Sequence, residues 1–141
     1  MCPGNKPSEQ LLDYHRSVAA GGVGMTTVAY AAVTRSGLSF DRQLWMRPEI
    51  VSGLRRLTDA VHVEGAAASI QLGHCGNMSH KSICGCLPVG ASSGFNLYSP
   101  TFVRGFVPMS CRKWLVRMAE LFVWHASPDS MLSEYMPDMA T

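Results

Sequence analysis

The feature that most constrains the fold is an alternation of helix-like and strand-like segments in the first half of the chain. Residues 8–20 carry apolar side chains at helical spacing, and 23–33 form an uncharged run of small, β-branched and aromatic residues. A helical pattern at 48–64 and a short apolar run at 66–72 repeat this order. Such alternation is typical of an α/β fold with helices covering a parallel sheet. We therefore predict parallel strands with covering helices, and a strand at 23–33 that is covered on both faces.

The borders of the two helical patterns carry local signals. Ser8 is suited to cap the first helix, and Gly21 and Gly22 to stop it. Pro48 suits a first helical turn, and Gly65 should end the second helix. The sequence thus predicts where both helices begin and end.

Length, charge and cysteine content bound the class of protein. The 141 residues, 47% hydrophobic and 16% charged, suit one globular domain. A net charge of +2 with scattered basic residues predicts no nucleic-acid partner. No apolar run approaches the roughly 18 residues of a membrane span, so we expect no membrane partner. Five cysteines without framework spacing suit a reducing compartment, and we expect a cytoplasmic location.

Polar residues gather at the exit of the second apolar run. Gln71 lies near its end, and His74 is the second residue after it. Ligands settle beyond the carboxyl ends of parallel strands, and a carboxamide can pair with the edge of a heterocycle such as a flavin. The alternative is that both side chains satisfy the backbone of a loop. The sequence leaves both interpretations open.

A cluster of potential metal ligands follows, made up of His74, Cys75, His80, Cys84 and Cys86. Zinc accepts such sulfur and nitrogen donors. The C-x-C spacing, however, differs from the usual two-residue knuckle and no second pair lies at the expected distance, which favours unliganded thiols. We assign no metal ligand.

The second half of the chain is less regular. Residues 76–105 are rich in glycine, serine, proline and asparagine, which predicts a long working loop or a segment that lacks its partner structure. Helical spacing returns after 106 and fades towards the end. We expect one segment at 1–106 and a divergent tail at 107–141, helical and then irregular.

Three stretches resemble one known family. YHRSVAAGGVGMTTVAYAAV at 14–33, LTDAVHVEGAAASIQLGHCGN at 57–77, and PVGASSGFN followed by RG within 88–105 are similar to the Old Yellow Enzyme family. That family comprises FMN-dependent NADH:flavin oxidoreductases and 2,4-dienoyl-CoA reductases. The resemblance covers about residues 7–106, with the motifs in the family's order.

The resemblance implies a partial (β/α)8 TIM barrel with FMN over the C-terminal ends of its strands. It implies hydride transfer from NAD(P)H through the flavin to the activated double bond of a small unsaturated carbonyl-type substrate. Gln71 matches the glutamine that binds the pyrimidine side of the flavin. Ala29 and Tyr30 match the strand end beside the flavin, and His74 is expected to be a supporting donor. No residue matches a catalytic group.

The departures from the family are equally specific. Its barrel takes roughly 250 residues, and its first strand, substrate-binding histidines and proton-donor tyrosine have no counterpart here. From Phe106 onward the resemblance ends. We therefore expect a truncated oxidoreductase, which sequencing the transcript across codons 100–115 would test. The alternative is a catalytically inactive product or an interaction partner that associates through exposed barrel edges.

Overall fold

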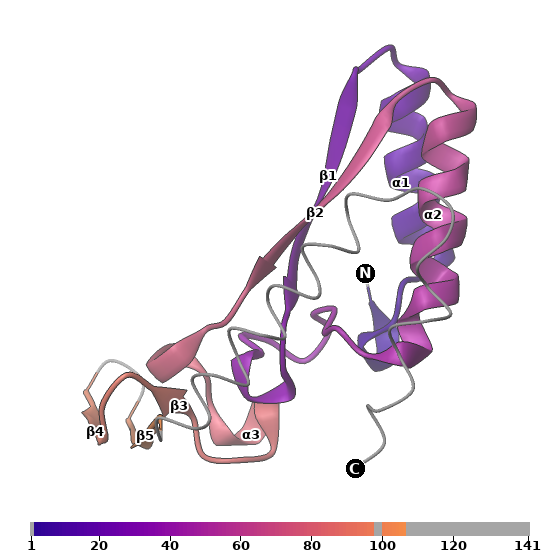
Figure 1. The fold of residues 1–141 in the computed structure, drawn as a ribbon. Coiled ribbons are helices and arrows are strands. Elements are labelled where there is room, and N and C mark those ends of the chain that lie inside the picture. Colours follow the sequence, from indigo (N-terminus) through magenta and orange to yellow (C-terminus); the bar gives the residue numbers. More distant parts are fainter. Residues whose placement is uncertain (1, 98–99, 107–141) are drawn as a thin grey trace. The chain divides into compact units, whose positions relative to one another are not determined.

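A computed structural model describes residues 2–97 and 100–106 (Figure 1). Up to Gly105 the chain forms one compact unit, and the predicted tail at 107–141 lies outside the described residues. The helices are α1 (Glu9–Ala20), α2 (Val51–Val63) and the short α3 (Lys81–Cys84). The strands are β1 (Met25–Ala32), β2 (Ala67–Gly73), β3 (Val89–Gly90), β4 (Gly94–Asn96) and β5 (Thr101–Gly105).

The borders of α1 follow the predicted signals. The Ser8 hydroxyl accepts a hydrogen bond from the backbone N–H of Leu11 at 3.2 Å, which caps the helix. At the other end Gly22 takes a φ of 87°, a left-handed conformation that suits glycine. The prediction for α2 was wrong at its start. Pro48–Ile50 forms a 3-10 turn, and the α-helix begins only at Val51.

The two long strands pair in parallel and lie on two helices. β1 and β2 align from Met25 opposite Ala67 to Val28 opposite Ile70. Helices α1 and α2 lie side by side on one face of the pair (Figure 1). Their apolar side chains are buried against the strands, which is the helix-on-sheet layering that the alternation predicted. The most buried of these side chains are Leu11, Ala19, Leu54, Leu57 and Val61.

Only one face of β1 is covered along its first half. Thr26 and Val28 face the helices and are buried, whereas Met25, Thr27 and Ala29 are exposed. The prediction of a strand covered on both faces was therefore wrong for this half. The uncharged composition arises from small and β-branched residues, which suit a strand whether or not a second layer packs on it.

A buried histidine joins α1 to β1. The His15 side chain is 3% exposed, and its Nδ1 lies 2.8 Å from the Thr26 hydroxyl oxygen. Burial lowers the pKa of His15 below its ordinary value, because the interior disfavours the charged imidazolium. This pair of polar groups is therefore a neutral hydrogen bond within the helix–strand interface.

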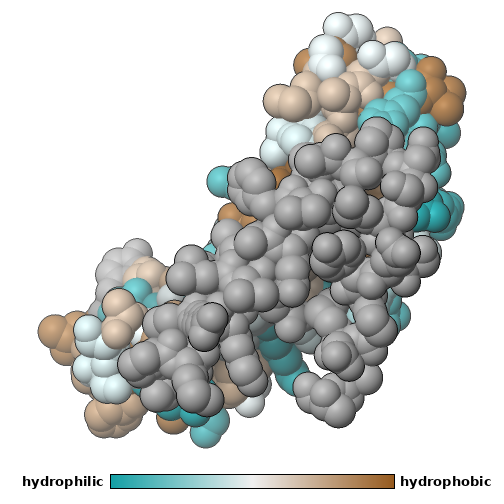
Figure 2. Space-filling view, viewed as in Figure 1, coloured by the Kyte–Doolittle hydropathy of each residue, from teal (hydrophilic) through white to brown (hydrophobic). Residues whose placement is uncertain are grey.

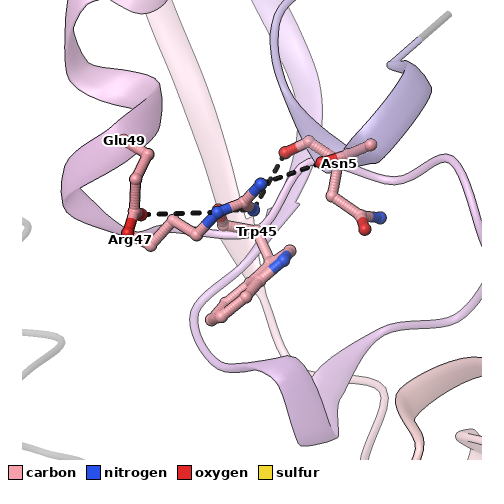
Figure 3. A network of polar contacts seen from close by, with 5 residues as sticks. Asn5, Trp45, Arg47 and Glu49 are labelled. Carbon is pink, nitrogen blue, oxygen red and sulfur yellow. Dashed lines mark hydrogen bonds and ion pairs between the residues drawn. The ribbon is translucent and has the colours of Figure 1, made fainter.

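The segment after β1 folds back and pairs with the last residue of this strand. The backbone of Ala32 donates to Leu44 and accepts from Met46, each at 2.8 Å. Arg47 then fastens the amino-terminal segment (Figure 3). Its guanidinium donates to the carbonyls of Gly4 at 2.8 Å and Asn5 at 3.1 Å. The last residue of β1 is thus paired with the chain's own loop.

The same guanidinium also donates to the carbonyl of Trp45 at 3.4 Å and makes two contacts with side chains (Figure 3). It lies 4.6 Å from the ring centre of Trp45, and its Nε lies 3.5 Å from the carboxylate of Glu49. In the same loop Leu44 is buried and Trp45 half-buried, whereas Phe40 is 52% exposed.

Residues 76–105 contain more regular structure than their composition suggested. After α3, strand β3 pairs in parallel with β5, and β4 pairs antiparallel with β5. The prediction of a structureless loop was wrong because very short strands leave no periodic signal.

Two exposed aromatic side chains lie on these short strands. Phe95 and Phe102 stack edge to face across the β4–β5 pair, where they are 51% and 69% exposed. Figure 2 shows hydrophobic residues on the surface at the β4 end.

Candidate functional site

The ladder between β1 and β2 is interrupted near its carboxyl end. Val28 pairs with Ile70, and the next pair is Ala31 with Leu72. Two residues of β1, Ala29 and Tyr30, therefore stand opposite a single residue of β2, Gln71. This two-against-one arrangement is a β-bulge, which bends the strand and changes the direction of the side chains around it. Three of the four residues predicted to bind the cofactor thus meet at one irregularity. We call Ala29, Tyr30 and Gln71 the bulge site.

The open face of the strand pair leads to the bulge site. Thr27 and Ser69 lie opposite each other on this face, with 2.6 Å between their hydroxyl oxygens. One alternation further along each strand come Ala29 and Gln71, which are both exposed. A small side chain beside an accessible carboxamide leaves room for a flat polar ring, which the amide can bind with a donor and an acceptor.

A buried glutamine holds the bulge from the loop side. Gln43 is 1% exposed, and its carboxamide nitrogen donates to the carbonyl of Tyr30 at 3.3 Å. Its carboxamide oxygen accepts from the backbone N–H of Ser39 at 2.7 Å. The Tyr30 hydroxyl is hydrogen-bonded to the Ser39 hydroxyl. The backbone of the bulge and the Tyr30 ring are therefore both fixed to the loop after β1.

His74 is built into the same loop. Its Nδ1 accepts from the backbone N–H of Gly76 at 2.9 Å, and its Nε2 lies 3.2 Å from the hydroxyl oxygen of Ser36. Acceptance at Nδ1 requires the hydrogen of a neutral ring to be on Nε2, which then donates to Ser36. Burial lowers the pKa of His74, which favours this neutral form.

Gly37 makes the position of His74 possible. A Cβ added at Gly37 would lie 2.5 Å from Cδ2 of the His74 ring, which is closer than two carbon atoms can approach. The backbone N–H of Cys75 also donates to the carbonyl of Gly37 at 3.1 Å. The ring therefore packs directly on the backbone of the loop after β1, and His74 has the contacts expected of a loop-supporting residue.

Two residues of the site were not found from the sequence. Gln43 lies in a loop rich in turn formers, and nothing in its neighbours marks it as buried. Gly37 sits in an ordinary Ser-Gly turn. Both act through backbone groups of residues distant in sequence, so only the folded arrangement of the loop against β1 identifies them.

The sequence had raised a metal site as an alternative and had predicted no membrane span. Within residues 2–97 and 100–106, no group of three or more histidine, cysteine, aspartate or glutamate side chains is arranged to hold a metal ion. In the same part of the chain, no helix has both the length and the apolar character needed to cross a bilayer.

Comparison with known proteins relates most of the chain to one family. Residues 2–108 match the profile of the NADH:flavin oxidoreductase / NADH oxidase family. Over 74 residues the chain is 50% identical to a 4,4'-dithiodibutanoate disulfide reductase of Rhodococcus erythropolis. The alignment covers 52% of this chain and 18% of that relative, so the chain spans less than a fifth of its length.

Solved structures share the fold. The old yellow enzyme homologue from Zymomonas mobilis superposes with a TM-score of 0.70 over 81% of this chain and 34% of its own, at 20% identity. A morphinone reductase in complex with tetrahydroNAD superposes with a TM-score of 0.72 over 82% and 36%, at 16% identity. These are TIM-barrel proteins, and the described residues have the fold of part of such a barrel, as predicted.

Proposed function

The chain belongs to the NADH:flavin oxidoreductase / NADH oxidase family, and on this premise we propose that it contributes part of an FMN-dependent oxidoreductase of the ene-reductase type. The single observation that carries the proposal is the bulge site, where Gln71 stands opposite Ala29 and Tyr30. In a TIM barrel the carboxyl ends of the strands form the active site, and this bulge lies at that end of two neighbouring strands.

The residues of the bulge site fit a flavin ring. Gln71 offers an exposed carboxamide, whose NH2 and carbonyl can pair with the alternating acceptors and donors on the pyrimidine edge of FMN. The small side chain of Ala29 allows close approach to the strand. Tyr30 is tied back to Ser39, so its ring is held on the loop instead of rotating freely over the site.

His74 has a different relation to the cofactor. Both ring nitrogens already have partners within the protein, Gly76 on one side and Ser36 on the other. We propose that His74 supports the site by fixing the loop beyond β2, and that any bond to the flavin would replace the one to Ser36.

When bound, FMN would supply hydride transfer from NAD(P)H to an acceptor. The family name specifies NADH and flavin, and the relatives named above act on a dithiodibutanoate disulfide and on morphinone, both small organic molecules. We propose a small acceptor with an activated double bond conjugated to a carbonyl. The chain's own contribution would be to bind and orient the ring through Gln71.

Flavin retention tests the proposal directly. The full chain is purified under reducing conditions, mixed with FMN and passed through gel filtration, and its flavin absorbance is recorded. We expect retained flavin in the wild type. Gln71→Ala should weaken FMN binding about twofold to tenfold for each hydrogen bond that it removes, since one hydrogen bond contributes about 0.5–1.5 kcal/mol. Gln10→Ala, which removes an exposed carboxamide from α1, is the matched control and should bind FMN like the wild type.

Two results would contradict the proposal. One is a folded, monodisperse wild-type chain that retains no flavin at any FMN concentration tested. The other is equal weakening by Gln71→Ala and Gln10→Ala, which would show that the carboxamide at the bulge has no special role.

A second candidate function rests on the open face of the strand pair. Met25 is 57% exposed on this face, and Phe102 is 69% exposed on β5. Exposed apolar surface of this kind often marks a protein interface. We propose, as the alternative, a catalytically inactive chain that associates with a protein partner through these surfaces. Concentration-dependent self-association without flavin binding, measured by analytical ultracentrifugation, would favour it.

A further inference from the structure

The turn Cys84-Gly85-Cys86 closes helix α3 and has no part in the function proposed above. Cys84 is 1% exposed and packs in an apolar cluster with Ala32 and Leu38, whereas Cys86 is exposed. The Cys84 thiol lies 3.0 Å from the carbonyl oxygen of Cys86, to which it can donate. The buried sulfur is thus directed across the turn at the residue that carries the accessible one.

Gly85 allows this close return of the chain. Its φ of 72° is in the left-handed region, which glycine adopts without strain. A Cβ added at Gly85 would lie 2.9 Å from Nη2 of Arg35, so the guanidinium of Arg35 rests directly against the turn. A positive group therefore lies at the turn and acts electrostatically on Cys86.

The surroundings of the two thiols give them different acidities. Burial by itself raises the pKa of Cys84, but hydrogen bonds from the Ser79 hydroxyl and from Cys86 outweigh it, and the pKa lies below its ordinary value. Burial and the bond to Cys84 raise the pKa of Cys86, against the opposing effect of Arg35 and Arg104. Cys84 is therefore the more acidic thiol of the pair, and it reaches the nucleophilic thiolate form more readily than the accessible Cys86.

We propose that Cys84 and Cys86 form a dithiol that reduces low-molecular-weight disulfides by thiol–disulfide exchange. In the first step Cys86 gives its proton to solvent, its sulfur attacks one sulfur of the substrate, and one thiolate leaves. In the second step Cys84 gives its proton to solvent, and its thiolate attacks the sulfur of Cys86 and expels the second thiolate. The two protein thiols are oxidised to one disulfide, and the substrate disulfide is reduced to two thiols.

The reduced full chain, freed of reductant, can be tested with glutathione disulfide as the probe. Remaining thiols are then alkylated and the chain is digested with trypsin. Cleavage after Lys81 and Arg104 places both cysteines, and no others, in the peptide 82–104. We expect this peptide to lose two hydrogens and resist alkylation, with two glutathione thiols released per chain. Alkylation of both cysteines, or a lasting glutathione adduct on the wild-type peptide, would overturn the proposal.

Variants separate the two roles. Cys84→Ser should stop the reaction after the first step and leave glutathione attached at Cys86, and Cys86→Ser should abolish the reaction because the buried thiol cannot reach the probe. Cys75→Ser removes a thiol outside the pair and should react like the wild type. Absence of an adduct in Cys84→Ser, or undiminished reaction in Cys86→Ser, would refute the assigned order. The peptide map of the wild-type chain tests for the disulfide between Cys84 and Cys86 even if a variant fails to fold.

Discussion

The two ends of the β1–β2 strand pair are built on different principles. The amino-terminal half pairs without interruption and rests on apolar side chains of α1 and α2. The carboxyl-terminal half contains the bulge, and beside buried residues such as Ala31 and Ala32 it is held by hydrogen bonds between side chains and backbone, chiefly those of Gln43 and His74. The regular half gains its stability from burial of apolar surface, which requires no special geometry. The irregular half uses directional bonds to place polar groups where a ligand can reach them.

The largest expected effect tests the regular half. Leu57→Ala removes a side chain of α2 that is 2% exposed, and the cavity should lower the free energy of unfolding by about 2–5 kcal/mol. Urea denaturation of the purified chain measures it. Val63→Ala, at an 84% exposed position of the same helix, is the control and should change stability little. Equal effects of the two variants would show that burial of the apolar side chains of α2 does not stabilise this half of the strand pair.

An intermediate effect tests the irregular half. Gln43→Met keeps the approximate volume of the side chain but leaves the Tyr30 carbonyl and the Ser39 N–H unpaired. The cost should be about 1–3 kcal/mol. Because these bonds fix the bulge, the variant should also retain less FMN per folded chain than the wild type. The retained flavin absorbance and the folded fraction from a denaturation curve, both measured at the same temperature, give this ratio. Gln10→Met is the control. A variant that loses stability but retains FMN like the wild type would show that the bonds of Gln43 do not contribute to flavin binding.

A smaller effect appears on acidification, and it compares the two halves directly. Burial lowers the pKa of both His15 and His74 below the ordinary value of 6.5. Below that pH the unfolded chain binds protons that the folded chain does not, so the free energy of unfolding decreases as pH falls. It should therefore decrease between about pH 7 and about pH 5.

Denaturation midpoints across this pH range measure the effect. His15→Gln should flatten the acid dependence by removing the titrating group of the regular half, and His74→Gln should do the same for the irregular half. An unchanged pH dependence in both variants would show that other groups govern the acid response.

Much of this architecture could be predicted from local signals. The Ser8 cap, the double glycine after α1 and the two uncharged runs fixed the order and approximate limits of both long helices and strands. Gln71 was predicted as a site residue from its place at a strand end. The start of α2 and the short strands of residues 76–105 could not be predicted. A 3-10 turn and strands of two or three residues are too short to impose a period on the sequence.

The candidate site could be recognised only once the register of β1 and β2 was known. The sequence places Gln71 more than forty positions from Ala29 and Tyr30, and only the slip between the Val28 and Ala31 pairs sets it opposite both. The roles of Gln43 and Gly37 could not be predicted from the sequence either, because they depend on backbone groups that folding brings close.

The sequence by itself determined the α/β order, the helix borders and the family motifs, because these depend on propensities and spacings within a few residues. The tertiary structure decided which face of β1 is covered, where the bulge lies and which thiol of the C-x-C turn is buried. Those properties depend on packing between distant segments, and a linear pattern carries no direct record of them.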